Sequence, residues 1–377
     1  MAEASLWARQ YRTLNLASGY PGISTPPSMK KKAEISISED LNQYSATRGL
    51  QSLREAISVK LKHKNGIEAD PESGILITCG AAEALFAAVF SLVRDDDEVI
   101  VFEPAFESYV PNVLMARGRP VVVRLEPPGW EVDADALRAA FSARTRAILV
   151  NTPHNPTGKV FSREELTLIS ELCIAHDAYA VTDEIYEYIT YDGAEHISLM
   201  SFPGMADRTV TVGGFSKTFS CTGWRLGYCA APPALVDEMD KVHTYLTVCA
   251  PTPFQHAAAD AFTVEPSYFE ELRRFYGRQR ERLFEILTGS GFNAFKPCGS
   301  YFMMADFTPF GFTDDHEFAH TLARDYGVSA VPERAFCHSG GCTGKMVRFC
   351  FSRSDEALAE AERRLAPLRR LLRAGQR

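Results

Sequence analysis

Short apolar segments rich in β-branched residues alternate with amphipathic segments of helical period through the middle of the chain. Such apolar segments are typical of strands buried on both faces, and their alternation with helices is typical of parallel β-α units. Seven strands are predicted, at residues 75–78, 98–102, 121–125, 147–150, 178–182, 209–212 and 226–230. Helices are predicted at residues 82–92, 108–117, 134–141 and 163–176, the last opened by a capping box of Ser162 and Glu165. We therefore expect an α/β fold with a seven-stranded, mostly parallel sheet.

The pattern changes from about residue 253, where the chain becomes mostly helical. A long helix is predicted at residues 267–290, followed by short strands near residues 301–306 and 346–351. We expect a large α/β domain at residues 33–284. A smaller α+β domain would combine residues 1–32, as an N-terminal arm, with residues 285–377.

Composition and charge narrow the class of protein. The chain has 377 residues, of which 46% are hydrophobic and 23% charged, as in ordinary soluble globular enzymes. A formal net charge of -8 argues against a nucleic-acid ligand, and no apolar run approaches the roughly 20 residues that cross a bilayer. The nine cysteines include no Cys-x-x-Cys pair, so neither a zinc site nor a disulfide framework is expected. A reducing cytoplasm is the expected location.

Candidate chemistry falls at the carboxyl ends of the predicted strands, where open parallel sheets bind ligands. Lys217 lies in a polar turn after the strand at residues 209–212, and Arg225 follows eight residues later. A lysine amine forms an imine with an aldehyde only when unprotonated, which burial and a nearby cation favour. The arginine fork suits a phosphate group. The alternative is a surface lysine in a Gly/Ser loop.

Two further strand ends offer weaker signals. Gly80, Ala81 and Ala82 open a helix after the strand at residues 75–78, and its first amides can face an anion. Small residues in such a turn also serve close packing. Phe106, after the strand at residues 98–102, is either a flat surface for an aromatic ring or a core residue.

The next two strand ends carry polar side chains. Asn155 precedes a proline and can direct its amide at a ring hydroxyl, although an Asn-Pro turn can be purely structural. Asp183 can pair with a protonated pyridine nitrogen, and Tyr186 can bind a phenolate oxygen. A carboxylate at this position can also be a simple helix cap.

Together these residues resemble the fold type I pyridoxal 5'-phosphate enzymes, specifically the class I/II aminotransferases of the kynurenine and methionine/glutamine branch. The likeness extends from Asn-Leu-Ala-Ser-Gly-Tyr-Pro at residues 15–21, through Leu-Asn-Gln-Tyr-Ser-Ala-Thr-Arg-Gly at 41–49, to Arg-Phe-Cys-Phe-Ser at 348–352. It implies a three-layer fold, pyridoxal 5'-phosphate as cofactor and a two-fold homodimer. No metal, membrane or nucleic-acid partner is implied.

The resemblance also implies residue roles. Lys217 would bind the cofactor aldehyde, Asp183 its pyridine nitrogen, and Asn155 and Tyr186 its phenolate oxygen, while Phe106 would stack on the ring. Gly80, Ala81, Ala82, Ser216 and Arg225 would surround the phosphate, with Tyr44 reaching it from the neighbouring subunit. Arg348 would bind the substrate α-carboxylate, beside Gly19, Tyr20 and Asn155.

One position departs from the family pattern. The family usually has a serine three positions before the lysine, and this chain has Gly214. The missing neutral hydrogen bond corresponds to about 0.5 to 1.5 kcal/mol. Cofactor binding is therefore expected to survive.

The expected reaction is amino transfer between an L-α-amino acid, neutral, aromatic or sulfur-containing, and a 2-oxo acid, with Lys217 as the base at Cα. The same residues would serve a β/γ-elimination, γ-replacement or cyclising enzyme of natural-product biosynthesis. Pocket residues would decide between them, with Trp7, Tyr20, His154, Tyr245 and Tyr301 as candidates. A non-catalytic cofactor-sensing module would need a basic helix-turn-helix region, which we do not expect here.

Overall fold

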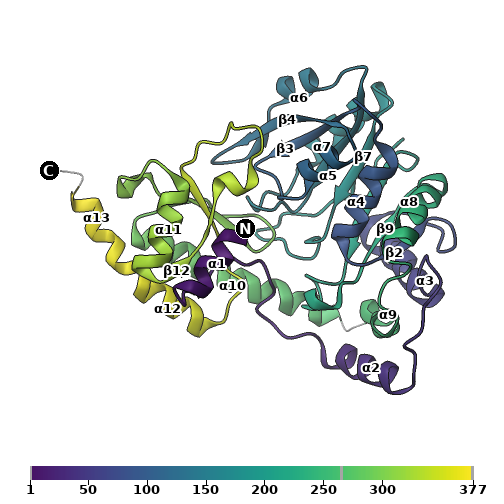
Figure 1. The fold of residues 1–377 in the computed structure, drawn as a ribbon, viewed down its shortest axis with the longest axis horizontal. Coiled ribbons are helices and arrows are strands. Elements are labelled where there is room, and N and C mark those ends of the chain that lie inside the picture. The colour runs from purple at the N-terminus through teal and green to yellow at the C-terminus, as the bar shows by residue number, and fades with distance from the viewer. Residues whose placement is uncertain (1, 264–265, 375–377) are drawn as a thin grey trace.

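The largest element of the computed structural model, which describes residues 2–263 and 266–374, is an eight-stranded sheet (Figure 1). Its strand order is β2-β9-β8-β7-β6-β3-β4-β5. The strands are β2 (Ile75–Thr78), β3 (Glu98–Glu103), β4 (Arg119–Glu126), β5 (Glu131–Val132), β6 (Thr145–Asn151), β7 (Tyr179–Asp183), β8 (Thr209–Gly214) and β9 (Gly227–Ala230). The pairs from β4 through β3, β6 and β7 to β8 are parallel, whereas β9 is antiparallel to β2 and β8.

The mostly parallel α/β class is confirmed, but the predicted strand number is wrong. The additional strand β5 has two residues and pairs antiparallel with the end of β4. A two-residue strand is too short to produce a hydrophobic period, so only its pairing with β4 identifies it. The other seven strands lie within a few residues of their predicted positions.

Helices cover both faces of this sheet. On one face lie α4 (Ala81–Leu92), α5 (Tyr109–Met115) and α8 (Pro233–Leu246), and on the other α6 (Ala134–Ala140) and α7 (Arg163–Ala175). Alternate residues of β3 enter the two cores, Val99 and Val101 on one side and Ile100 and Phe102 on the other. Strands buried on both faces explain the continuous apolar segments of the sequence. The predicted capping box of Ser162 and Glu165 is present.

The part of the molecule that contains the large sheet has further helices. They are α2 (Pro27–Ser38), α3 (Gln51–Lys60), the π-helix η1 (Leu61–Asn65) and α9 (Thr252–Ala258). A fourth apolar cluster joins α3 to the edge of the sheet, with Leu53 and Ile57 packing near Ile75 and Ile77.

The second part of the molecule is α+β. It contains α10 (Pro266–Ser290) and a four-stranded antiparallel sheet of β10 (Asn293–Ala294), β11 (Phe302–Asp306), β14 (Met346–Cys350) and β13 (Val331–Pro332). Helices α11 (Asp315–Tyr326), α12 (Asp355–Leu365) and α13 (Arg369–Ala374) gather with α1 (Ala2–Gln10) at the left of Figure 1. The N-terminal arm joins this part because β1 (Leu14–Asn15) pairs with β12 (Val328–Ser329). The domain limits at residues 32/33 and 284/285 stay a prediction, and α10 continues through the second limit.

Cysteine pairing and hydropathy add two observations. Cys337 and Cys342 form a disulfide, although no disulfide framework was expected from the sequence. These cysteines are five residues apart and so do not have the Cys-x-x-Cys spacing on which that expectation rested. The seven other cysteines, all in the described part of the chain, are free. No described helix has the length and apolar character needed to cross a membrane.

A buried ion pair ties α3 to the segment that follows β7. The Lys60 ammonium contacts the Glu187 carboxylate and donates to the Tyr228 hydroxyl at 3.0 Å, and Lys60 and Glu187 are both buried. Asn65 donates to Glu187 at 3.0 Å. Burial raises the pKa of Glu187, but the Lys60 charge and these hydrogen bonds outweigh it and hold the pKa below its ordinary value.

We predict that Lys60→Ala lowers the free energy of unfolding by about 3–5 kcal/mol, because Glu187 is left buried without its cation. Urea denaturation followed by circular dichroism measures the change. Lys62→Ala is the matched control, since Lys62 pairs with Glu68 in solvent and its removal costs at most about 1 kcal/mol. Equal losses in the two variants would contradict the prediction.

Candidate active site

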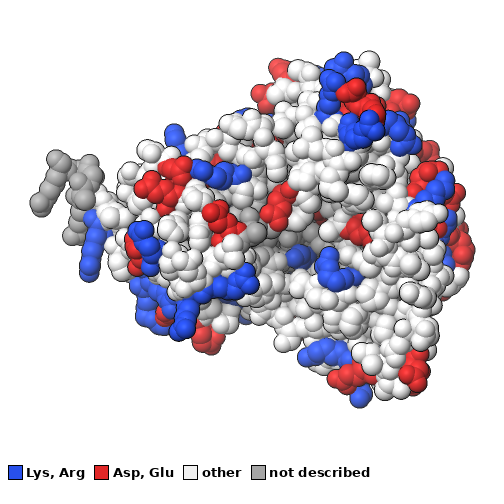
Figure 2. All heavy atoms as spheres, in the orientation of Figure 1, with Lys and Arg blue, Asp and Glu red and all other residues white. Residues whose placement is uncertain are grey.

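A cavity of about 250 Å³ lies beyond the carboxyl ends of the parallel strands. Segments from the whole chain line it, from the N-terminal arm to β14. The lining residues are Gly19, Ala81, Ala82, Leu85, Phe106, Asn151, Asn155, Asp183, Ile185, Tyr186, Ser216, Lys217, Thr222, Arg225, Phe302 and Arg348. Figure 2 shows a face hollowed near its middle, with acidic and basic side chains interspersed elsewhere.

Most of the residues singled out in the sequence meet in this cavity, and three do not line it. Gly80 lies behind Arg225. Tyr20 is 47% exposed and packs its ring 4.5 Å from the Arg353 guanidinium. Tyr44 is 80% exposed. Within one chain, therefore, neither tyrosine faces the cavity.

Lys217 follows the end of β8 and points into the cavity. Its amine donates to the Gly19 carbonyl oxygen at 2.9 Å and lies 5.8 Å from the centre of the Tyr301 ring. Burial lowers the pKa of Lys217 to about 8, although Cys350 and Asp183 act to raise it. At neutral pH roughly a tenth of the molecules carry an unprotonated Lys217 amine, far more than for an exposed lysine.

Asp183 ends β7 as a buried carboxylate. Its Oδ2 accepts a hydrogen bond from the Tyr109 hydroxyl at 2.7 Å, and its Oδ1 accepts one from the Ile185 amide at 3.3 Å. Burial raises the pKa of Asp183, while these two hydrogen bonds and the Lys217 charge oppose that rise. Tyr109 was not identified in the sequence analysis, because only the strand order brings the start of α5 near the end of β7.

A close approach of glycines shapes the amino end of α4. Gly80 precedes the helix with φ of 81°, and a Cβ there would lie 2.6 Å from Nη2 of Arg225. A Cβ on Gly227 would lie 2.5 Å from the Ala81 amide nitrogen. Gly80 therefore leaves room for the Arg225 guanidinium, and Gly227 allows β9 to lie close to the amino end of α4. The arginine and the helix dipole together favour an anion there.

Arg348 lies on β14 at the opposite wall. It is fully buried, donating from Nη1 to Asn155 Oδ1 at 2.7 Å and from Nη2 to the Ala17 carbonyl at 2.8 Å. Its guanidinium lies 4.0 Å from the centre of the Phe302 ring. Burial lowers the pKa of Arg348 to about 10, so it stays a cation at neutral pH.

Asn151 is a second contributor that the sequence analysis missed. Its side chain donates to the Asp183 carbonyl at 2.8 Å and accepts from the Asn155 amide at 2.7 Å. It thereby fixes the ends of β6 and β7 relative to each other. Its place as the last residue of a strand is the signal that could have indicated it.

The space around Gly214, where the family usually has a serine, is limited by Ile185. A Cβ at this position would lie 2.8 Å from Cδ1 of Ile185, so a serine would require Ile185 to move. Ser216 lies between Gly214 and Lys217 and does line the cavity.

The five residues considered as pocket determinants separate in the structure. Tyr301 donates to the Gly19 carbonyl at 3.0 Å, beside Lys217. His154 is buried against Thr157, and burial lowers its pKa to about 3. Trp7 packs on His316 in the second part of the molecule, and Tyr245 is 92% exposed. Among the described side chains of these five residues, Tyr301 is thus the one that hydrogen-bonds to a residue of the cavity wall.

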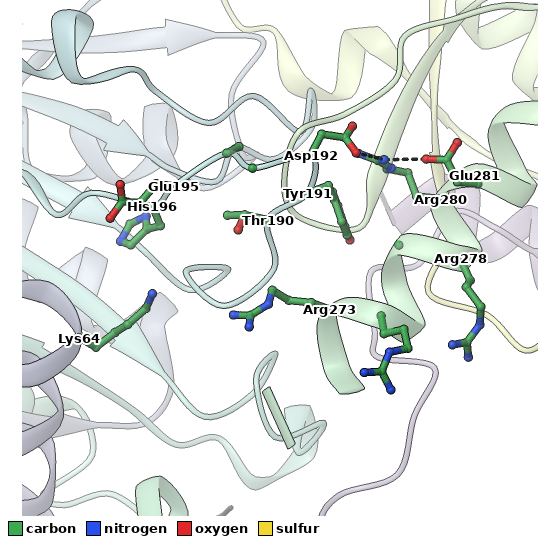
Figure 3. A pocket seen from close by; sticks show the side chains of 14 residues that line it. Lys64, Thr190, Tyr191, Asp192, Glu195, His196, Arg273, Arg278, Arg280 and Glu281 are labelled. Carbon is green, nitrogen blue, oxygen red and sulfur yellow. Dashed lines mark hydrogen bonds and ion pairs between the residues drawn. The ribbon is translucent and has the colours of Figure 1, made fainter. Parts of the chain in front are cut away.

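A larger hollow of about 700 Å³ lies between α10 and the segment around residues 190–196 (Figure 3). Its buried Arg280 is neutralised by Asp192 and Glu281, whereas Lys64 and Arg273 are exposed. None of the site residues expected from the sequence lines this hollow. The smaller cavity around Lys217 is therefore the candidate active site.

Comparison with known proteins gives a consistent set of similarities. The family model for aminotransferase class I and II matches residues 11–365. The chain is 40% identical to the probable N-succinyldiaminopimelate aminotransferase DapC of Mycobacterium tuberculosis, covering 97% of this chain and 95% of the relative. It is 36% identical to methionine aminotransferase of Escherichia coli, covering 97% and 95%. Human kynurenine–oxoglutarate transaminase 3 is 35% identical, with 93% and 83% covered. The structure of the M. tuberculosis N-succinyldiaminopimelate aminotransferase superimposes with a TM-score of 0.95, covering 97% of this chain and 96% of that one.

The low pKa of Lys217 leads to a direct prediction. After reductive ¹³C-methylation of the ligand-free protein, the NMR signal of Lys217 should titrate with a midpoint near pH 8. The exposed Lys62 supplies a comparison signal in the same spectra. Signals are assigned by their loss in Lys217→Arg and Lys62→Arg. A Lys217 midpoint above pH 10 would contradict the burial argument.

Proposed function

Because the chain belongs to the class I and II aminotransferases, we propose that the cavity around Lys217 is its active site. The protein is an aminotransferase that depends on pyridoxal 5'-phosphate, as members of this family do. The family match confirms the resemblance noted in the sequence. One observation carries the site assignment: the half-buried, desolvated amine of Lys217, the buried carboxylate of Asp183 and the buried guanidinium of Arg348 line the same cavity.

The residues of the cavity fit this cofactor. The amides of Ala81 and Ala82, the Ser216 hydroxyl and Arg225 would bind the phosphate at the amino end of α4, with Gly80 allowing Arg225 its position. The glycine contacts at positions 80 and 227 support this, because added Cβ atoms would displace Arg225 and the Ala81 amide. Phe106 would stack on the ring.

The ring oxygen would be bound by donors on the other side. The Asn155 Oδ1 already accepts from Arg348, so the Asn155 amide group keeps its N–H donors for a ligand. Burial raises the pKa of Tyr186, so its hydroxyl stays protonated and can donate. Asp183 would hold a proton on the ring nitrogen.

When bound, pyridoxal 5'-phosphate supplies an electron-accepting ring that stabilises negative charge at the substrate Cα. The unprotonated Lys217 amine, which its lowered pKa provides, would hold the cofactor aldehyde. When a substrate amine takes its place, the same Lys217 amine would act as the general base that takes the proton from the substrate Cα and holds it for return. The Gly19 carbonyl at 2.9 Å orients the Lys217 amine in the free enzyme.

The substrate is proposed to be a neutral, aromatic or sulfur-containing L-α-amino acid, with a 2-oxo acid as acceptor. Arg348 would bind its α-carboxylate with its planar fork, with Gly19 and Asn155 in the same cavity wall and Tyr20 next to Gly19 in the chain. Among the described residues lining the cavity, the cations are Lys217, Arg225 and Arg348, and all three already have roles. Ile185 and Phe302 add apolar walls. The name of the methionine aminotransferase supports such a substrate.

Elimination, replacement or cyclisation has no specific support. The relatives described above are named aminotransferases or transaminases, and the cavity offers no feature that favours loss of a substituent over amino transfer. The match to a family of enzymes likewise favours an enzyme over a non-catalytic sensing module.

We also propose a homodimer in which Tyr44 binds the phosphate in the neighbouring subunit. Tyr44 is 80% exposed and does not line the cavity of its own chain. Ile35, Ile37 and Leu41 are also exposed in this region, and a second copy would cover such apolar side chains. We also propose a cytoplasmic location, because seven of the nine cysteines are free; the Cys337–Cys342 disulfide is the observation that counts against it.

The function is tested by mixing the yellow holoenzyme with single amino acids and assaying products together with the visible absorbance of the cofactor. Methionine and phenylalanine should each give a stoichiometric 2-oxo acid. Aspartate should react with kcat/KM at least about tenfold lower, because its second carboxylate would be buried without a cation. Lys217→Ala should lose both the product and the absorbance of the lysine-bound cofactor. Release of ammonia and a side-chain fragment would instead support elimination.

The dimer is tested by subunit complementation. Lys217→Ala and Tyr44→Ala should each be impaired alone, but co-refolding them should restore activity. In the mixed dimer one site then has a native Lys217 from one subunit and a native Tyr44 from the other. Each variant refolded alone is the control. Absence of any recovery in a demonstrated mixed dimer would contradict the composite site.

A further inference from the structure

We propose that Tyr109 is a positioning residue that holds the carboxylate of Asp183 in place for the cofactor's ring nitrogen. The proposal rests on the function assigned to the cavity and extends it to a residue outside the cavity wall. Tyr109 is absent from the cavity lining, so it would act only through Asp183.

The contact between the Tyr109 and Asp183 side chains is short and buried. The Tyr109 hydroxyl donates to Asp183 Oδ2 at 2.7 Å, and the residues are 4% and 6% exposed. The other carboxylate oxygen has only a longer contact, 3.3 Å from the Ile185 amide. Tyr109 thus occupies Oδ2 and limits rotation of the carboxylate, leaving Oδ1 as the atom available to a ligand.

Tyr109 also belongs to the segment that supplies Phe106. It is the first residue of α5, its amide donates to the Phe106 carbonyl at 3.1 Å, and the two rings meet edge to face with centres 5.7 Å apart. A single short turn therefore positions both the ring proposed to stack on the cofactor and the hydroxyl that restrains Asp183. Movement of this turn would disturb both contacts together.

The charges around Asp183 explain why one hydroxyl matters. The titratable groups that act on it are Tyr109 on α5, Lys217 after β8, and Glu184 and Tyr186 on its own segment. Burial raises the pKa of Asp183, and the Tyr109 hydrogen bond is the first of the contacts that oppose this rise. Burial and the Asp183 charge raise the pKa of Tyr109 well above its ordinary value, so its hydroxyl remains a donor throughout the working range of pH.

The test is Tyr109→Phe in the holoenzyme, a change that keeps the ring and removes one hydroxyl. A hydrogen bond to a charged group corresponds to about a 10- to 100-fold effect, so the Kd for pyridoxal 5'-phosphate should rise and kcat fall within that range. KM for methionine should change less than about twofold, because Arg348 is untouched. The Asp183 pKa should rise. The acidic limb of the pH–activity profile should therefore shift to higher pH than in the native enzyme.

Two comparisons separate positioning from a general packing defect. Tyr191→Phe is the matched control, because the buried Tyr191 hydroxyl also makes one hydrogen bond, to the Ser300 carbonyl at 2.7 Å, outside the cavity. It should leave the cofactor Kd and the pH profile unchanged. In an Asp183→Asn background, Tyr109→Phe should have little further effect on the cofactor Kd, since the charge that it supports is gone.

The possible failures are distinguishable. If Asp183→Asn strongly weakens cofactor binding but Tyr109→Phe changes neither the Kd nor the pH profile, the positioning role is wrong and the active-site assignment stands. Equal effects of Tyr109→Phe in the native and Asp183→Asn backgrounds would also overturn it, as would an equal loss in Tyr191→Phe. If Asp183→Asn itself is without effect, the role assigned to Asp183 fails first.

Discussion

The desolvation of the Lys217 amine is the constraint on which the rest of the structure depends. An exposed lysine is almost entirely protonated at neutral pH and is a poor nucleophile, whereas burial lowers the Lys217 pKa to about 8. That burial cannot come from the turn that carries the lysine. It requires the N-terminal arm at Gly19, the second part of the molecule at Tyr301, and the ends of the neighbouring strands. The two parts of the fold are therefore needed together for the chemistry of one side chain.

The end of β7 shows how a strand serves function and stability at once. Asp183 lines the cavity, and the next residue, Glu184, instead accepts from the buried His196 at 2.8 Å and from Ser198. Glu187, a few residues on, carries the ion pair with Lys60. Polar groups on one side of this segment thus face a ligand, while those on the other side anchor the segment to α3. The buried carboxylates of Glu184 and Glu187 both have partners within the protein, as buried charges require.

At the amino end of α4, the backbone segments around the cavity approach each other closely. Gly80 and Gly227 bring the amino end of α4, Arg225 and β9 nearer to each other than side chains would permit. Gly214 likewise leaves room for Ile185, which lines the cavity. The absence of the usual serine at position 214 is therefore accommodated by an apolar contact, and the loss of one neutral hydrogen bond leaves the helix dipole and Arg225 in place.

The sequence by itself determined the strands, most helices and the candidate residues of a lysine-centred site, because these depend on local periodicity and on motifs at strand ends. It identified Lys217, Asp183, Asn155, Arg225 and Arg348 as candidates, and the structure places all five in one cavity. Only the tertiary structure decided which more distant groups meet them. Tyr109, Asn151 and Phe302 depend on strand order and on the closeness of the two parts of the molecule, and the exposure of Tyr44 and Tyr20 depends on the path of the N-terminal segment. Local patterns carry no record of such contacts, because they arise between residues that are far apart in the chain.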